Sequence, residues 1–290
     1  MRAAIDFGIS NTDVVAQMDG EIHHWMEPFS GQPDVEMVRA LLAAGGVELA
    51  AITHLAVTGG HHRRLPSRID ACQIVGVNEV EAIGRGGVIM ADLPDSTQPL
   101  LVVSGGSGVA MIAARGNSFT HVTGSGVGGG TLLGLSRLLL GTVDPVEINV
   151  LAAQGNPNKI DLALRDVVSG PIGNLPADAT AVNFGRLAWG GDDTTHAGFT
   201  APSFANPDFA EADMAAAIVT LISQVIGTIA VNAARAQAIE QVVMIGHLTD
   251  MSMIRTELTH VGRFFGLPIA TPLHTGRATA LGALYSLPSA

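Results

Sequence analysis

The chain has 290 residues, of which 47% are hydrophobic and 14% are charged, as is typical of a well-buried globular protein. Its 26 acidic and 15 basic residues give a formal net charge of −11, which argues against nucleic acid or an anionic membrane as a partner. Cys72 is the single cysteine and cannot form an internal disulfide. With no secretory signal or membrane-spanning run in the sequence, we expect a cytoplasmic protein.

The N-terminal part predicts three strands joined by tight turns. Ala3–Asp6 is an apolar strand, "DVVAQ" is a second, and "MDG" turns the chain into a third, "EIHHW". An amphipathic helix is expected over Val35–Ala44, a strand over "AITHLAVTGG", and a helix over Asn78–Met90.

The segment "STQPLLVVSGGSGVAMIAARGNSFTHVTG" repeats this pattern of strands and glycine turns. Asp6, Gly8 and Ser10 correspond to Ser104, Gly106 and Gly108, each about 98 residues later. This distance indicates two related lobes rather than a solenoid, whose period is about 20 to 50 residues. A chance match of so degenerate a pattern remains an alternative. We expect an N-terminal lobe over residues 1–97 and a C-terminal lobe over residues 98–290.

The C-terminal half predicts alternating helices and strands. Helices are expected over "TLLGLSRLLLG", "VEINVLAAQG", "IDLALRDVV", "MSMIRTELTHVGRFF" and "RATALGALYSL", and strands over "QVVMIG" and "LPIATP". Ala212–Gln237 is a long helix that is apolar nearly all round, so we expect it to be buried inside the molecule or against a second subunit. The alternation indicates an α/β layer structure.

The stretch "HVTGSGVGGGTLLGL" satisfies G-x-G-x-x-G through Gly124, Gly126 and Gly129, and Asp144 follows where a dehydrogenase would carry its ribose-binding acid. No apolar strand ends at Asp144, however, and a proline follows it directly, so the context disfavours an NAD site. A Walker P-loop is excluded because the only lysine, Lys159, is remote from every glycine loop.

Three glycine loops together favour a different phosphate site. Backbone N–H groups of residues 8–12, 105–108 and 124–130 can form anion-binding concavities, and a helix N-terminus follows the last. Two hairpin loops with an acid on the first strand predict the actin-like sugar-kinase architecture, in which Asp6 orients hydrated Mg²⁺ and the loops hold the phosphates of ATP. The alternative is that the glycines only permit tight turns.

The motifs then resemble one family, the type II pantothenate kinases. "IDFGIS", "AVTGG", "NEVEAIGRG", "GSGVGGGTLLGLSRLL", "LAAQGNPNKIDLALRDV", "AVNFGR", "MIGHLTDMSMIRTEL" and "ATALGAL" are similar, in order, to motifs of that family. The resemblance implies an α/β, actin-like (ribonuclease H-like), two-lobed kinase fold with a duplicated βββαβα core and an ATP cleft between the lobes. It also implies an ATP- and Mg²⁺-dependent phosphotransferase that phosphorylates pantothenate, a homodimer, and coenzyme A or an acyl-coenzyme A as a candidate inhibitor.

By position in these motifs, Glu79 matches the general base and Glu81 the neighbouring acid. His121 and Gly124, with Glu81, are expected to contact the acceptor, and Asp6 to hold Mg²⁺ through water. The expected nucleotide-binding residues are Asp6, Gly8, Ser10, Asn11, Thr12, Gly106, Ser107, Gly108, Gly126, Gly128, Gly129, Gly130, Thr131 and His247.

Two residues depart from the family pattern. Asp13 stands where the family has a lysine that touches ATP phosphates, and His121 stands where it has a substrate-contacting arginine. Val109 and Ala110 also lack the hydroxyls of the family's middle loop. These departures motivate two alternatives: a kinase of the same fold for another hydroxylated metabolite, and a non-catalytic regulator that binds nucleotide or coenzyme A.

The stretch "GGHHRRLPSR" (Gly59 to Arg68) gathers two histidines and three arginines. It could attract an anionic substrate or product, and a solvated loop is the alternative interpretation.

Overall fold

The computed structural model describes residues 1–28, 31–95, 97–169, 176–188 and 210–288. These residues divide into two compact units. The first unit comprises Met1–Gly126, Ala230–Asp250 and Ile269–Ala290, and the second comprises Val127–Ile229 and Met251–Pro268. The predicted lobe boundary after residue 97 falls inside the first unit and stays a prediction.

A six-stranded sheet in the first unit has the strand order β3-β2-β1-β4-β6-β5. Its strands are β1 (Arg2–Phe7), β2 (Asn11–Met18), β3 (Glu21–Pro28), β4 (His54–Gly59), β5 (Arg68–Ile69) and β6 (Cys72–Gly76). β1, β2 and β3 form antiparallel hairpins, whereas β1, β4 and β6 run parallel. The carboxyl ends of these three parallel strands therefore lie at one edge of the sheet.

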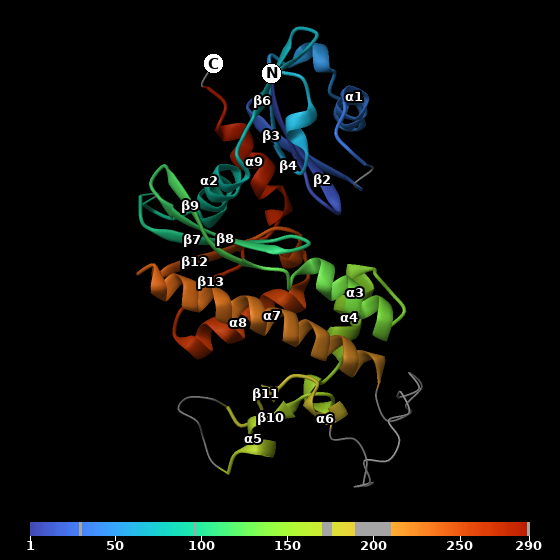
Figure 1. Ribbon diagram of the computed structural model, residues 1–290, viewed down its shortest axis with the longest axis vertical. Helices are drawn as coiled ribbons and strands as arrows, with labels where there is room; N and C mark the ends of the chain where they lie inside the picture. Colours follow the sequence, from blue (N-terminus) through green and yellow to red (C-terminus); the bar gives the residue numbers. More distant parts are fainter. Residues whose placement is uncertain (29–30, 96, 170–175, 189–209, 289–290) are drawn as a thin grey trace. The chain divides into compact units, whose positions relative to one another are not determined.

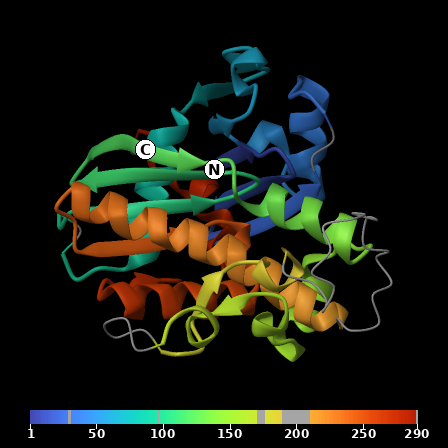
Figure 2. The ribbon, with the colours of Figure 1, turned by 60° about the horizontal axis from the view of Figure 1, so that its bottom comes forward.

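A second sheet in the same unit has the order β13-β12-β7-β8-β9. Its strands are β7 (Leu100–Gly105), β8 (Val109–Arg115), β9 (Ser118–Ser125), β12 (Gln241–Ile245) and β13 (Ile269–Ala270). Figure 2 shows β7, β8 and β9 side by side. β12 runs parallel to both β7 and β13.

The two sheets are built alike, which confirms the repeat read from the sequence. Both begin with two consecutive hairpins whose first strand then pairs in parallel with a later strand, β4 in one sheet and β12 in the other. The bounds of β7, Leu100–Gly105, equal those of β1, Arg2–Phe7, shifted by the offset of the sequence repeat.

Two helices lie between the sheets, α2 (Glu79–Ala91) and α9 (Ala278–Tyr285) (Figure 1). They approach so closely that a Cβ atom on Gly86 would lie 2.0 Å from the carbonyl oxygen of Ala278. A Cβ on Gly282 would likewise lie 1.9 Å from the carbonyl oxygen of Ala82. Glycine at these positions is thus what allows the backbones to pack in contact.

Three apolar clusters hold this unit together. One packs residues of the first sheet, including Ala4 and Ala56, against Leu281 and Leu284 of α9. Another packs Ile83 of α2 against the second sheet. The third lies on the opposite face of the first sheet beneath α1 (Val35–Ala44), which starts at the N-terminal cap Asp34. Both faces of the first sheet are therefore covered, as expected for an α/β layer structure.

The second unit is mostly helical. Its elements are α3 (Gly129–Leu139), α4 (Pro145–Gln154), β10 (Leu162–Ala163), α5 (Leu164–Val167), β11 (Thr180–Val182), α6 (Gly185–Ala188), the first part of α7 (Glu211–Ala236) and α8 (Ser252–Phe265). Short 3₁₀ turns are η1 (Leu49–Ala51), η2 (His62–Arg64), η4 (His247–Asp250) and η5 (Thr275–Arg277) in the first unit, and η3 (Pro157–Lys159) in the second.

The prediction of one helix over "IDLALRDVV" is wrong in its first half. Leu162 and Ala163 pair with β11 instead, and only Leu164–Val167 is helical. The cause is Asp161, a buried residue whose carboxylate accepts hydrogen bonds from the Phe184 N–H, at 2.7 Å, and from the Thr180 hydroxyl. These contacts tie the segment to residues about 20 positions away, which the local apolar pattern does not reveal.

The long apolar helix is present as α7, within a residue of each expected end. By length and composition it could cross a membrane, but 67% of its most apolar window is buried inside the protein. A core helix of a soluble protein has the same properties. The burial agrees with the expectation that this helix packs inside the molecule.

Candidate functional site

Two acidic residues face each other at the end of the first hairpin. Asp6 on β1 is directly opposite Asp13 on β2, and directly opposed residues of an antiparallel pair project to the same face of the sheet. Asp13 is only 4% exposed. Two like charges in this arrangement repel each other unless a cation or a proton compensates them.

Asp13 is compensated by two histidines. Its Oδ1 lies 2.8 Å from Nε2 of His24 on β3, and its Oδ2 lies 2.9 Å from Nε2 of His247 in η4. His247 also contacts Asp250, with Nδ1 and Oδ2 2.9 Å apart. We call these four residues the His–Asp network. It joins the hairpins of the first sheet to the turn after β12 of the second sheet.

The network changes the ionisation of its members. Burial disfavours the charged form of His247, but hydrogen bonds to Asp13 and Asp250 outweigh it and raise the pKa of His247 to about 10. Burial would raise the pKa of Asp13, but the hydrogen bonds from His24 and His247 hold that pKa below its usual value. At neutral pH His247 is therefore a cation held between two carboxylates.

The pKa of Asp6 shifts in the opposite direction to that of Asp13. Burial, followed by the negative charges of Asp13 and Glu79, raises the pKa of Asp6 to about 7, and His247 opposes the increase. Asp6 therefore lies in a negative environment at neutral pH, in which a divalent cation would favour its ionised form.

The two predicted phosphate hairpins meet. The Ser10 and Ser107 hydroxyl oxygens lie 2.8 Å apart, although one comes from each repeat. A Cβ on Gly8 would lie 2.5 Å from the carbonyl oxygen of Asn11, so the first turn requires glycine there. Gly106 donates its N–H to the carbonyl of Gly108 at 3.0 Å, which closes the second turn.

Glycines also shape the surroundings of Asp6 and His247. Gly59 ends β4 with φ +80°, and a Cβ there would lie 2.5 Å from Oδ1 of Asp6. A Cβ on Gly276 would lie 2.3 Å from the His247 ring. The backbone thus approaches both side chains more closely than any other residue type would allow.

Glu79 and Glu81 stand in the first turn of α2, whose N-terminal cap is Asn78. The negative charge of Glu79 acts on Asp6. Glu81 instead forms an ion pair with Arg85, at 3.2 Å, one turn further along. Residues two apart on a helix face different sides, so Glu79 is the better placed of the two to act near Asp6.

His121 lies on β9 beside an irregularity in the ladder. It is opposite Ile112, which belongs to the apolar cluster beneath α2, so its side chain projects to the face that α2 covers. The pairing then skips Val122, and such a bulge changes the direction in which the following side chains project. Gly124 is close to this histidine, since a Cβ there would lie 3.7 Å from its Nε2 and 2.6 Å from a carbonyl oxygen of β8.

The remaining predicted nucleotide residues are in two places. Asn11 and Thr12 begin β2 and Gly126 ends the first segment of the first unit. Gly128 to Thr131 lie in the second unit, at the N-terminus of α3, where the helix dipole favours an anion. The first unit therefore brings together Asp6, both hairpins, Glu79 and His247, whereas His121 is placed only on β9 of its second sheet.

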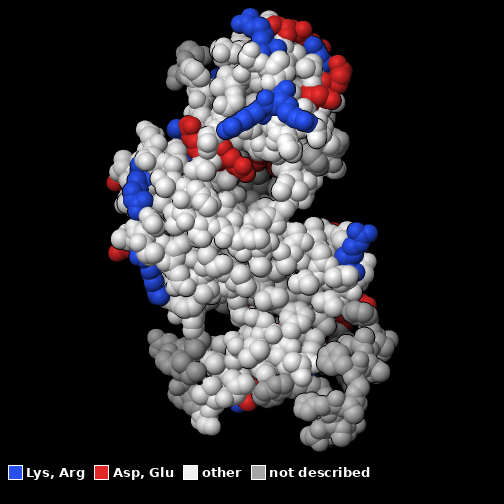
Figure 3. Space-filling view, viewed as in Figure 1, with Lys and Arg blue, Asp and Glu red and all other residues white. Residues whose placement is uncertain are grey.

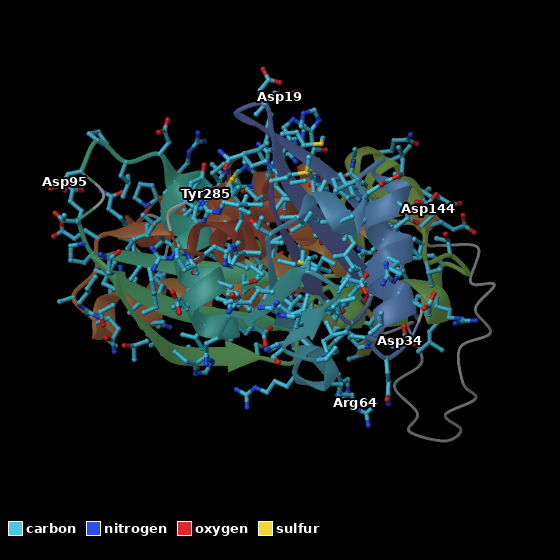
Figure 4. The ribbon with its side chains drawn as sticks, turned by 90° about the horizontal axis from the view of Figure 1, so that it is seen from above. Asp19, Asp34, Arg64, Asp95, Asp144 and Tyr285 are labelled. Atoms are coloured by element: carbon cyan, nitrogen blue, oxygen red, sulfur yellow. The ribbon has the colours of Figure 1, made fainter. Side chains whose placement is uncertain are left out.

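The structure also explains Asp144, the acid of the discarded dehydrogenase pattern. Its Oδ1 accepts a hydrogen bond from the Val146 N–H at 2.9 Å, as the N-terminal cap of α4 (Figure 4). A helix cap is a sufficient reason for an aspartate before a proline.

The residues at this edge fit ATP and Mg²⁺. Among the described residues no three His, Cys, Asp or Glu side chains could hold a metal ion as a group. Magnesium, however, commonly uses one or two carboxylates together with water and substrate phosphates. Asp6 at the carboxyl end of a parallel strand meets this requirement, and ligands of open α/β sheets bind at that edge.

Sequence reasoning missed part of this site. It did not foresee that His24 and Asp250 join the His–Asp network. Of the four network residues, only Asp13 could be suspected from the sequence of having a polar partner, because an acidic residue inside an otherwise apolar strand needs one when it is buried. The partner could not be named, since His247 lies 234 residues further along the chain.

A duplicated sheet with two glycine hairpins at its carboxyl edge is the fold of the actin-like class, and solved structures share this fold. The activator of the 2-hydroxyisocaproyl-CoA dehydratase from Clostridium difficile, with bound ADPNP, matches with a TM-score of 0.60 and 15% identity over 98% of this chain and 92% of its own. A ROK family glucokinase from Streptomyces griseus, in complex with glucose and AMPPNP, matches with a TM-score of 0.57 and 10% identity over 98% of both chains. The predicted fold class is therefore confirmed.

The chain belongs to the Fumble family, whose model matches residues 87–285. A type II pantothenate kinase of Oceanobacillus iheyensis is 26% identical over 290 residues, which cover 98% of this chain and 99% of that protein. Pantothenate kinase 1 of Oryza sativa subsp. japonica is 43% identical over 94 residues, which are 31% of this chain and 14% of that protein. These relatives confirm the resemblance seen in the motifs.

Proposed function

We propose that the protein is an ATP-dependent small-molecule kinase that phosphorylates pantothenate to 4′-phosphopantothenate, the first step of coenzyme A synthesis. The observation that carries this proposal is the meeting of the two glycine hairpins beside Asp6 and Glu79 at one sheet edge. The likeness over nearly its full length to a type II pantothenate kinase gives the substrate.

The glycine loops provide the phosphate site. The hairpins at Gly8–Thr12 and Gly106–Gly108 present backbone N–H groups and the Ser10 and Ser107 hydroxyls to the phosphates of ATP. Asp6 would hold Mg²⁺ through water, and the bound ion would neutralise charge on the phosphates. Phosphoryl transfer depends mainly on such positioning and charge stabilisation.

Glu79 is the proposed general base. It accepts the proton of the acceptor hydroxyl as that oxygen attacks the γ-phosphorus, which typically contributes about 10²–10⁴-fold to the rate. Its place at the first residue of α2 fixes its backbone, and its charge already acts on Asp6.

The His–Asp network takes the place of a phosphate-binding lysine in the first hairpin. Asp13 would repel phosphates if it carried its charge alone, but His24 and the His247 cation compensate it. The hairpin therefore contributes backbone groups and hydroxyls rather than a side-chain cation. His121 is the proposed contact for the acceptor where the family has arginine.

The decisive experiment measures ADP release with Mg²⁺·ATP over pantothenate and related primary alcohols, in the wild type and in Glu79→Gln. We expect turnover on pantothenate and a loss of kcat of at least about 10²-fold in the variant. Glu36→Gln is the matched control and should retain kcat, because Glu36 is an exposed acid in the first turn of another helix, α1.

The other possible results of this assay would each favour a different function or a different base. Turnover on a different alcohol alone would refute pantothenate as the substrate. Nucleotide or coenzyme A binding without any turnover would indicate a regulator, and full activity of Glu79→Gln would remove Glu79 as the base.

We further propose a cytoplasmic homodimer inhibited by coenzyme A or an acyl-coenzyme A, as the family resemblance implies. Light scattering at micromolar concentration tests the dimer, and a monomer would refute it. Titration of the kinase assay with coenzyme A tests the inhibition.

A further inference from the structure

The segment that follows β4 holds a histidine for which the proposed function has no role. Gly59 turns the chain with φ +80° and His61 continues it in the left-handed region with φ +59°. The turn η2 then places His62, Arg63 and Arg64 beyond the carboxyl end of β4. This edge also carries Asp6 on the neighbouring strand β1.

His62 is fixed against both β4 and β6. Its Nδ1 lies 2.7 Å from the carbonyl oxygen of Gly59, the residue whose backbone touches Asp6. Its ring lies over Gly76, since a Cβ there would be 3.5 Å from both Cδ2 and Nε2. Gly76 ends β6, and the chain reaches Glu79 three residues later. The ring therefore lies at the carboxyl ends of β4, the neighbour of the strand that carries Asp6, and β6, the strand that precedes Glu79.

The hydrogen bond to Gly59 decides which ring nitrogen can meet a ligand. A carbonyl oxygen only accepts, so Nδ1 must carry the proton that it donates. In the neutral ring Nε2 is then a hydrogen-bond acceptor. This atom has no partner among the residues that the structure describes, and it is not buried.

The neighbouring arginines are less suited to hold a substrate in place. Arg63 and Arg64 are exposed, and Figure 4 shows the Arg64 side chain extending away from the ribbon. Figure 3 shows basic side chains gathered on the surface of the first unit. They can attract an anionic acceptor by their charge, whereas His62 is the member of the segment with a fixed orientation.

We propose that His62 binds the acceptor of the kinase reaction, with Nε2 accepting a hydrogen bond from a hydroxyl of a hydroxylated organic anion such as pantothenate. This inference rests on the proposed function, because it places the acceptor beside Glu79. The segment Gly59 to Arg68 would then contribute to the choice of acceptor and would not be only a solvated loop.

Two variants separate a substrate contact from a structural one. The amide nitrogen of Asn can replace Nδ1 in the hydrogen bond to the Gly59 carbonyl, but Asn has no atom at the position of Nε2. His62→Asn therefore keeps the structural bond and removes only the proposed contact, whereas His62→Ala removes both. His61→Asn is the matched control, since Asn tolerates the left-handed backbone of the adjacent position.

The measurement is the Kd of pantothenate, by calorimetry, in the presence of Mg²⁺ and a non-hydrolysable ATP analogue. We expect His62→Asn to weaken pantothenate binding by about tenfold, the loss of one hydrogen bond to substrate. Its affinity for the ATP analogue and its urea unfolding midpoint should equal those of the wild type, as should all three quantities in His61→Asn.

Pantothenate binding by His62→Asn at wild-type affinity would overturn the inference, even if His62→Ala binds poorly, because the role would then be structural. A wild-type chain that binds no pantothenate would overturn it as well. Binding without ADP formation in the wild type would refute the proposed catalysis and leave the comparison of the histidine variants decisive.

Discussion

The stability of the protein should fall between neutral and alkaline pH as His247 loses its proton. Its pKa rises from the ordinary 6.5 to about 10 in the folded protein, so the folded state binds this proton more tightly than the unfolded state. The stabilisation is complete below pH 6.5 and is lost as the pH rises through about 10. The substitution His247→Gln removes it.

The size of this stabilisation follows from the pKa shift of His247. One pKa unit corresponds to about 1.4 kcal/mol, so a rise from 6.5 to about 10 corresponds to on the order of 4–5 kcal/mol at acidic pH. The His247 side chain is 30% exposed, and solvent screening reduces this to about 2 kcal/mol. The lowered pKa of Asp13 reports the same contact and is not added. By pH 9.5 less than about a fifth of the stabilisation should remain.

The assay is urea unfolding followed by circular dichroism at several pH values from 6.5 to 9.5, without nucleotide. The wild type should be more stable than His247→Gln at pH 7, and the difference should shrink steadily as the pH rises. His23→Gln is the control, because His23 is an exposed neighbour of the network on β3. A difference that stays constant with pH would refute the conclusion that His247 is charged in the folded protein.

Two further substitutions, one of them with a control, test the glycine beside Asp6 and the helix cap at Asp144. Gly59→Ala places a Cβ 2.5 Å from Asp6 at a φ of +80°, so it should lower the unfolding free energy by about 1–3 kcal/mol and also reduce kcat. The control Gly266→Ala, with φ +66° and no atom within 4 Å, should lower the unfolding free energy by about 1 kcal/mol and leave kcat unchanged. Equal kcat values in the two variants would contradict the placement of Asp6. Asp144→Ala should lower the unfolding free energy by about 1 kcal/mol through loss of a helix cap and leave the KM for ATP unchanged, whereas a raised KM would reopen a nucleotide role for this residue.

The fold class and most of the helices and strands could be predicted from the residue pattern alone. The strand repeat predicted two related sheets because equal spacing of apolar runs and glycine turns produces equal hairpins. Helix α1 was predicted to the residue from its amphipathic pattern, and in the structure Asp34 caps its N-terminus. The motif around Glu79 was found because the family resemblance extends along nearly the whole chain.

Which polar groups compensate one another depends on contacts between distant segments, and these could not be predicted from the residue pattern. Asp13 could be read from the sequence as the loss of a lysine, but not as the centre of the His–Asp network. His24 is reached across a hairpin and His247 through the second sheet, and hydrogen bonds between distant segments leave no periodic pattern in the sequence. The orientation of the His62 ring is a second case, because it depends on a carbonyl oxygen and a glycine from two different strands. Local sequence sets the backbone conformation of each element, whereas charge and proton positions depend on which elements the fold brings within a few ångströms.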